Sequence, residues 1–302
     1  MKVALLILLL ISGVVLSNSP VDRCYTYIEV GDVKNAIKEG LSGIKLYPKN
    51  PNSHYCLGIA YQLAGMMDKA LGSFKKAESL ATNKEDFMLI YNRIGFVLAK
   101  LQDYNSALHY YMRSLSLARS LKDIDMQATL LHNMGSVYDD MGMPDKALSY
   151  YTMALELRGD SVENASTYNN IALIYANKGN FKKAEEFFKK SIRGYELAGN
   201  YRGVGIVMLN LGIAYRNMKK YELALKYVTE GLNRVLKAGD LYWTATGYLY
   251  LGWLATDAGM FGVAVRSLEN AYKIYVDIGA NSQAESVKKD IRLLKKLMRG
   301  TK

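Results

Sequence analysis

Apolar side chains between Leu131 and Ala154 recur at helical spacing on either side of a short turn. Gly142 and Pro144 mark the turn, because both residue types interrupt regular helices. Residues three and four positions apart share one face of a helix, so each stripe predicts a helix that buries that face. The segment is therefore predicted to fold as helix, turn and helix. The first stripe holds Leu131, Met134, Tyr138 and Met141, and the second holds Ala147, Leu148, Tyr151, Ala154 and Leu155.

A spacing of small residues within this segment recurs along the chain. In six segments a small residue is followed twelve positions later by alanine, and Cys24 with Ala36 adds a weaker seventh copy. Successive copies lie 34, 37, 40, 37, 40 and 40 residues apart. A period of this size indicates stacked copies of one structural unit. The six segments begin at Gly58, Gly95, Gly135, Ala172, Gly212 and Gly252.

This pattern resembles the tetratricopeptide repeat (TPR) family, whose 34-residue unit is a helix–turn–helix. The family's small residue, tyrosine, turn glycine and alanine are complete in three copies. Other copies depart, with Gln102 and Lys219 at the turn and Leu98 and Ala255 at the tyrosine position. The resemblance implies an all-α TPR solenoid, a right-handed superhelix of antiparallel helix pairs, with about seven repeats over residues 18–280. The complete copies are Gly58-Tyr61-Gly65-Ala70, Gly135-Tyr138-Gly142-Ala147 and Ala172-Tyr175-Gly179-Ala184.

The longer spacings place three or six extra residues between repeats, which equals about one or two helical turns. They fall at Leu117 to Asp125, Gly194 to Gly203 and Leu232 to Leu241. Repeats of this length resemble the 40-residue subclass of the family, which occurs in scaffold and peptide-receptor proteins.

The first seventeen residues, Met1 to Ser17, carry one lysine followed by an apolar run. The run is short for a transmembrane span of about 20 residues and has the length of a signal-peptide core. Residues 1–17 are therefore interpreted as a signal peptide or N-terminal anchor, and a buried helix capping the solenoid is the remaining alternative. An exported protein, whether periplasmic, secreted or lumenal, is expected, and anchoring to a membrane by this segment is the alternative to its cleavage.

Residues 281–302 are predicted to form a basic amphipathic capping helix. Ser282 and Glu285 have the spacing of a capping box, which would start the helix. The last twenty residues hold seven Lys or Arg and two acids, a net charge of +5 (7 − 2). The predicted apolar stripe consists of Val287, Ile291, Leu294 and Met298.

The formal net charge of the chain is +11. It favours a solvated basic surface, or attraction to acidic lipid headgroups or an acidic partner. A membrane contact through the C-terminal helix is therefore possible. Nucleic-acid binding is not expected, because no basic–aromatic recognition motif is present.

Two cysteines, Cys24 and Cys56, fall on consecutive first helices of the predicted solenoid. In an exported chain they could form a disulfide, and two buried free thiols are the alternative. His54 with these cysteines does not match a zinc-site spacing, so no metal is expected. No phosphate loop, metalloprotease motif or nucleophile elbow is present, and Asp139 beside Asp140 is interpreted as a solvated groove wall. The chain is predicted to be no enzyme and to need no cofactor.

The resemblance also implies a concave groove lined by the first helix of each repeat. Asn133, Asn170 and Asn210 fall two positions before the small residue in successive repeats, where they could form a ladder that pairs with a peptide backbone. Pairing of these amides with the adjacent helix is the alternative. The family's carboxylate clamp for acidic chaperone tails is missing, because Asn92 and Phe96 stand where it needs Lys and Asn. The other predicted groove residues are His132, Asp139, Asn169, Leu173, Ile213, Arg216 and Trp253.

Taken with the resemblance, these features predict a non-enzymatic protein–protein interaction scaffold. Its expected ligand is a peptide or partner segment with apolar side chains, held in the groove. The alternative is a structural subunit of an envelope or membrane-associated complex, or a protein that self-associates through its C-terminal helix. The fold alone does not choose between them.

Overall fold

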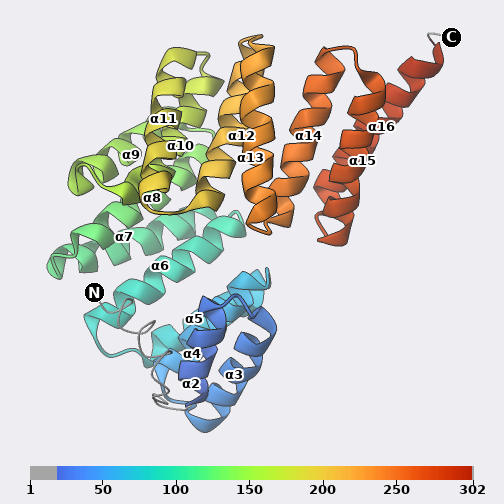
Figure 1. The fold of residues 1–302 in the computed structure, drawn as a ribbon. Helices are drawn as coiled ribbons and strands as arrows, with labels where there is room; N and C mark the ends of the chain where they lie inside the picture. Colours follow the sequence, from blue (N-terminus) through green and yellow to red (C-terminus); the bar gives the residue numbers. More distant parts are fainter. Residues whose placement is uncertain (1–18, 301–302) are drawn as a thin grey trace. The chain divides into compact units, whose positions relative to one another are not determined.

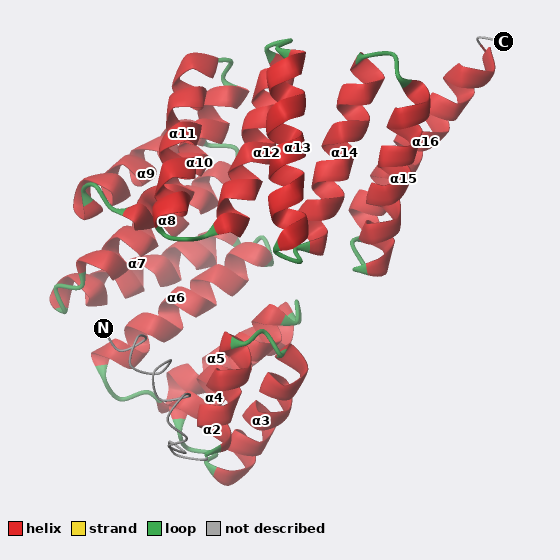
Figure 2. Ribbon diagram, in the orientation of Figure 1, coloured by secondary structure: helices red, strands yellow, loops and turns green. Residues whose placement is uncertain are grey.

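The computed structural model describes residues 19–300 and divides into two units, 1–150 and 151–302. The described residues form fifteen α-helices and one short 3-10 helix, which confirms the all-α prediction (Figures 1 and 2). The signal peptide or anchor predicted for residues 1–17 lies outside the described residues.

Unit 1 is built from consecutive antiparallel helix pairs, joined by turns too short for any other arrangement (Figure 1). The pairs α2/α3, α4/α5 and α6/α7 are followed by α8, and α9 (Pro144–Arg158) contains the boundary between the units. The helices are α2 (Pro20–Glu29), α3 (Val33–Leu46), α4 (Pro51–Leu63), α5 (Met67–Leu80), α6 (Lys84–Lys100), α7 (Tyr104–Ser120) and α8 (Ile124–Asp140).

Unit 2 repeats this plan with three further helix pairs and a final described helix. After the 3-10 helix η1 (Val162–Asn164), the pairs α10/α11, α12/α13 and α14/α15 stack in order and α16 packs on α15 (Figure 1). The helices are α10 (Ala165–Asn177), α11 (Phe181–Leu197), α12 (Tyr201–Asn217), α13 (Tyr221–Lys237), α14 (Leu241–Asp257), α15 (Phe261–Asp277) and α16 (Asn281–Gly300).

The turns of unit 2 recur every 20 residues, and this sets the helix length. Each turn contains one residue with positive φ, and five of these six residues are glycine. Lys219 is the sixth, at φ 59°, so the turn keeps its left-handed conformation without glycine. Helices α11 to α15 each span 17 residues as a result, which places the extra residues of the long repeats within the helices. The positive-φ residues are Gly179, Gly199, Lys219, Gly239, Gly259 and Gly279.

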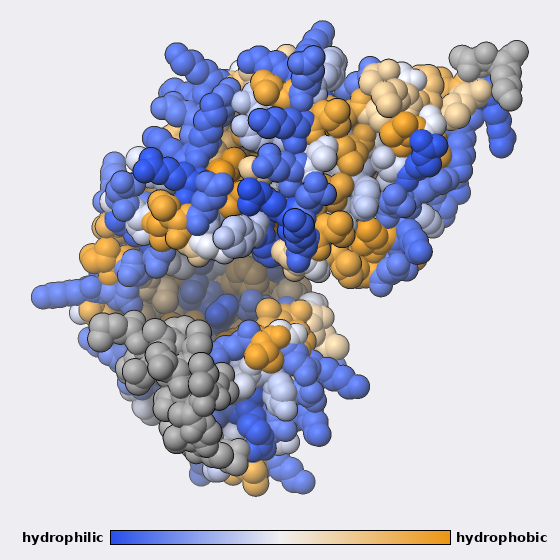
Figure 3. All heavy atoms as spheres, viewed as in Figure 1, coloured by the Kyte–Doolittle hydropathy of each residue, from blue (hydrophilic) through white to orange (hydrophobic). Residues whose placement is uncertain are grey.

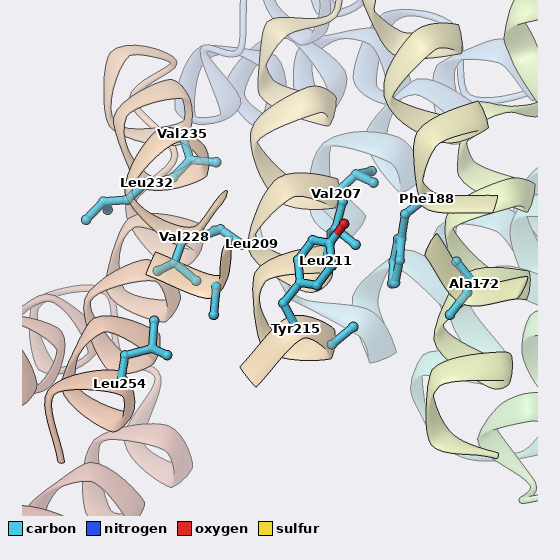
Figure 4. Packing of buried hydrophobic residues seen from close by; sticks show 13 residues of the cluster. Ala172, Phe188, Val207, Leu209, Leu211, Tyr215, Val228, Leu232, Val235 and Leu254 are labelled. Atoms are coloured by element: carbon cyan, nitrogen blue, oxygen red, sulfur yellow. The ribbon is translucent and has the colours of Figure 1, made fainter. Parts of the chain in front are cut away.

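The small residues that define the repeat lie where the two helices of a pair approach most closely. A Cβ atom added to Gly212 would lie 2.5 Å from Val228 Cγ2 and 3.1 Å from the Val228 backbone nitrogen. A Cβ on Gly95 would lie 2.8 Å from the ring of Tyr111. Figure 4 shows the core of unit 2, with Val228 beside Leu209. The repeat register read from the sequence therefore rests on physical contact across each pair.

Helix α16 departs in detail from the prediction. It begins at Asn281, so Ser282 lies inside the first turn and cannot cap the helix, and Glu285 pairs with Lys288 instead at 2.9 Å. Val287 and Leu294 are buried, but Met298 is 39% exposed, because it lies beyond the part of the helix that α15 covers. The capping-box prediction is therefore wrong, and the apolar stripe of α16 is buried only as far as Leu294.

Among residues 19–300, no helix combines the length and apolarity needed to cross a lipid bilayer.

Candidate interaction face of the first helices

The predicted groove residues lie on the first helices of successive pairs, and within each unit we call the surface of these helices the A-helix face. Most of them are half-buried, whereas Asp139 is exposed and Asn210 is only 8% exposed. The structure places five of them in unit 1 and seven in unit 2. They lie on α6 (Asn92, Phe96), α8 (His132, Asn133, Asp139), α10 (Asn169, Asn170, Leu173), α12 (Asn210, Ile213, Arg216) and α14 (Trp253).

Asparagines on neighbouring first helices are hydrogen-bonded to each other. In unit 1 the Asn133 Nδ2 donates to Asn92 Oδ1 at 3.0 Å. In unit 2 the Asn210 Nδ2 donates to Asn169 Oδ1 at 3.1 Å. In both pairs the two asparagines are 41 residues apart. One lies three positions before the small residue of its repeat, and the other lies two positions before the small residue of the next repeat. The amides therefore connect successive repeats on the A-helix face.

The asparagine contacts in unit 2 continue into a relay. Asn169 Nδ2 donates to Asn170 Oδ1 at 3.3 Å, and Asn170 Nδ2 donates to the Tyr151 hydroxyl at 3.2 Å. Each of these asparagines makes at least one hydrogen bond to a neighbouring side chain. The structure supports the alternative, in which the asparagines pair with the adjacent helix.

Trp253 lies at the centre of a second polar network in unit 2. Its indole Nε1 donates to Asp290 Oδ2 at 3.3 Å, and the Arg216 guanidinium lies 5.5 Å from its ring centroid. Arg216 also forms a bidentate pair with Asp257, at 2.6 and 3.0 Å. The network holds the Trp253 ring between α12 and α16.

Two residues of this network were missed from the sequence, namely Asp257 and Asp290, whereas Tyr250 falls at the same position of its repeat as Asn210. The Tyr250 and Trp253 ring centroids are 5.4 Å apart. Burial, with the nearby Tyr275 and Tyr242, raises the pKa of Tyr250 to about 12, so its hydroxyl stays neutral at physiological pH. The Arg216–Asp257 pair has the same 41-residue separation as the asparagine pairs, and a search for complementary side chains at that separation could have found it.

An apolar column runs along the A-helix face of unit 2. Leu173, Ile213 and Trp253 each follow the small residue of their repeat by one position, on α10, α12 and α14. All three are half-buried, so part of each side chain remains open to a ligand. In unit 1 Phe96 holds the same position, with Lys100 Nζ at 5.5 Å from its ring centroid.

Of the two adjacent aspartates on α8, Asp139 has a raised pKa. Partial desolvation, with the neighbouring Asp140, holds the pKa of Asp139 above its ordinary value. Two adjacent carboxylates disfavour each other's charge, which accounts for the direction of the shift. A cationic group on a ligand would relieve this repulsion.

The structure joins Cys24 of α2 to Cys56 of α4 by a disulfide, with the Cα atoms 6.3 Å apart. Both cysteines are fully buried, and the bond closes a separation of 32 residues. His54 beside them contacts the Pro48 carbonyl at 2.9 Å through Nε2. Within residues 19–300, no group of three or more His, Cys, Asp and Glu side chains is placed to hold a metal ion.

Two hollows of unit 2 lie apart from the predicted groove residues. One, of about 820 Å³, is bordered by the start of α12 and by α13, including Arg202 and Arg234. The other, of about 270 Å³, is mainly apolar and lies between α13, α14 and α15, with Leu225 and Met260 at its edge. Figure 3 shows apolar side chains gathered over α14, between α13 and α15.

Comparison with known proteins identifies the repeat. The family model described as "Tetratricopeptide repeat" matches residues 86–160, 163–237 and 203–275. A TPR repeat-containing protein of Methanocaldococcus jannaschii is 23% identical over 293 residues, which cover 82% of this chain and 50% of that protein. The chain thus spans about half the length of this relative. A photosystem I assembly protein of Prochlorococcus marinus is 33% identical over 126 residues, covering 37% of this chain and 69% of that protein.

Solved structures share the fold at low sequence identity. A Rap protein complexed with Competence and Sporulation Factor has a TM-score of 0.66 at 14% identity, covering 97% of this chain and 91% of that one. The apo form of the quorum sensor NprR from B. thuringiensis has a TM-score of 0.64 at 18% identity, covering 98% and 92%. These likenesses concern the fold alone.

Proposed function

Because this chain belongs to the tetratricopeptide repeat family of protein–protein interaction scaffolds, we propose that it holds an extended peptide segment on its A-helix face. The segment carries apolar side chains, and unit 2 supplies the main contacts. Members of this family typically act without catalysis, so the proposed activity is binding.

The observation that carries the proposal is the apolar column of Leu173, Ile213 and Trp253. Successive first helices lie one helix-packing distance apart, about 8–10 Å, and an extended chain advances about 3.3 Å per residue. About three residues of a bound peptide therefore span the distance from one residue of the column to the next. Apolar side chains at that interval would cover the three residues in turn.

The polar networks flank this column and preorganise it. The asparagine relay fixes α10 against α12, and the Arg216–Asp257 pair fixes α12 against α14. A ligand then meets side chains that are already ordered, which lowers the entropic cost of binding. We expect roughly micromolar affinity, about −8 kcal/mol.

The test selects peptides from a random phage-displayed library on the wild-type protein and titrates them against two variants. One variant combines Leu173→Ala, Ile213→Ala and Trp253→Ala. The control combines Leu197→Ala, Leu223→Ala and Leu236→Ala, which are exposed apolar residues on the second helices α11 and α13. We expect the first variant to lose at least about tenfold in affinity, which is 1.4 kcal/mol, while the control retains it. Equal affinity of both folded variants would refute the proposal.

We also propose that the chain is exported. The Met1 to Ser17 pattern supports this, and the Cys24–Cys56 disulfide is of the kind that persists in oxidising compartments. Cleavage after Ser17 would leave Asn18 as the mature N-terminus. N-terminal sequencing of protein from its native cell tests this, and Met1 on a chain recovered from the cytoplasm would refute it.

A further inference from the structure

Helix α16 presents an exposed face that differs from that of every other first helix in unit 2. Its inner face packs on α15 through Ala284, Val287, Ile291 and Leu294. The first helices α10, α12 and α14 each have a second helix of the same pair packed against them, whereas α16 is the last helix among the described residues. Most residues of α16 outside this inner face are exposed.

This open face carries a row of basic side chains. Lys289, Arg292, Lys296 and Arg299 are all exposed and lie at helical intervals of three and four, which places them side by side. None of the four makes an ion pair with another described residue, whereas Lys288 and Lys295 pair with Glu285 and Glu269. Glu285 pairs with Lys288 and also lies near Lys289 and Arg292, so it offsets part of the charge, and the row keeps a net positive charge.

Exposed leucines border the basic row. Leu293 is 60% exposed and Leu297 is 50% exposed. Leu293 lies four residues after Lys289 and three before Lys296, so apolar and basic groups alternate on one surface. A helix of this kind places leucines at the acyl boundary of a bilayer while its Lys and Arg side chains reach the headgroups.

We propose that the exposed face of α16 docks on an anionic lipid surface. The charge complementarity favours anionic headgroups, because several basic side chains in a row add their attraction to anionic lipids. Long, mobile Lys and Arg side chains suit a fluid array of headgroups. The docking is peripheral and reversible, and it leaves the A-helix face of α10, α12 and α14 to the peptide.

The test is co-sedimentation of the protein, without residues 1–17, with vesicles of equimolar phosphatidylcholine and phosphatidylserine. A charge-reversal variant combines Lys289→Glu, Arg292→Glu, Lys296→Glu and Arg299→Glu. The matched control combines Lys182→Glu, Lys226→Glu, Lys237→Glu and Arg266→Glu, four exposed basic residues on α11, α13 and α15 with the same change in net charge. We expect the first variant to lose vesicle binding, and the control to keep binding within a few-fold of wild type.

A second pair of measurements separates docking from general attraction. Leu293→Ser with Leu297→Ser should weaken binding several-fold at unchanged charge, and added salt should weaken the wild type further. Sedimentation with pure phosphatidylcholine at the same level would overturn the proposal, as would equal losses in the two charge-reversal variants. A wild type that remains in the supernatant, or that sediments only as a self-associated species without vesicles, would also overturn it.

Discussion

The two ends of the described chain join successive first helices in different ways. In unit 1 the first helices α2 and α4 are joined covalently, by the disulfide between Cys24 and Cys56. In unit 2 the helices α12 and α14 are joined by the Arg216–Asp257 pair, and α10 and α12 by the Asn169–Asn210 pair. Helix α2 has 10 residues and α4 has 13, whereas α12 and α14 each have 17.

The difference shows two ways of joining neighbouring repeats. Each repeat is stabilised by its own packing and by the interface with its neighbours. The disulfide adds a covalent link between the first two pairs, which stabilises them by restricting the unfolded chain. In unit 2 polar side-chain pairs join the first helices without such a link, also at α10, which has 13 residues like α4.

Removing the disulfide should produce the largest effect. Cys24→Ser with Cys56→Ser is expected to destabilise the first two helix pairs by about 2–4 kcal/mol, because the 32-residue separation becomes unconstrained in the unfolded state. Hydrogen exchange should rise in α2 to α5, while unit 2 keeps its protection. Equal numbers of reactive thiols in reduced and unreduced unfolded wild type would show that the bond does not form.

Two glycine substitutions compare a crowded helix position with an open one. Gly212→Ala should destabilise by about 1–3 kcal/mol, because the new Cβ meets Val228 at 2.5 Å. Gly262→Ala, on α15, meets nothing within 4 Å and should stabilise by about 0.5–1 kcal/mol through helix propensity. Thermal unfolding measures both, and a lower melting temperature for the second variant than for the first would contradict the repeat register.

The same contrast explains which features could be predicted from the sequence. The close helix contact at Gly212 could be predicted from the sequence, because the packing there leaves no room for a side chain and so requires glycine. The turn at Lys219 was harder to interpret, because the positive φ persists there without the usual glycine. The pattern of residue types therefore predicted the helix pairs, but it did not predict the strained backbone conformation of Lys219.

The candidate face was predicted only in part. Register placed Ile213 and Trp253 on the first helices, but it did not show which side chains meet across neighbouring repeats. From the sequence, the Asn210 amide could bond either a ligand or a residue of α10. Only the placement of the helices shows that it donates to Asn169 of α10. Asp290 was missed because it lies on α16, beyond the last recognisable repeat.

The turn at Lys219 gives a smaller effect of opposite sign. A non-glycine residue at φ 59° is strained, so Lys219→Gly should raise stability by about 0.5–1 kcal/mol. The reverse change at an equivalent turn, Gly259→Lys, should lower it by a similar amount. Chemical denaturation of the two variants checks the signs, and a loss of stability in both would show that glycine is not favoured at these turns.

The polar pair between α12 and α14 should have the smallest effect on stability. Arg216→Met removes the pair with Asp257 and is expected to cost about 0.2–1 kcal/mol, because both side chains are partly exposed to water. High salt should reduce the difference from wild type. A double-mutant cycle with Asp257→Asn measures the coupling, and a cost as large as that of removing the disulfide would contradict the comparison.

Shielding of Trp253 tests the proposed peptide contact most directly. The chain has two tryptophans, so Trp243→Phe leaves Trp253 as the only one, and Trp253→Phe leaves Trp243 as a matched control. A peptide selected on the wild type should protect Trp253 from acrylamide quenching in a saturable manner, with roughly micromolar affinity, and should leave Trp243 unchanged. Saturable binding that leaves the quenching of Trp253 unaltered would contradict a ligand on the A-helix face of unit 2.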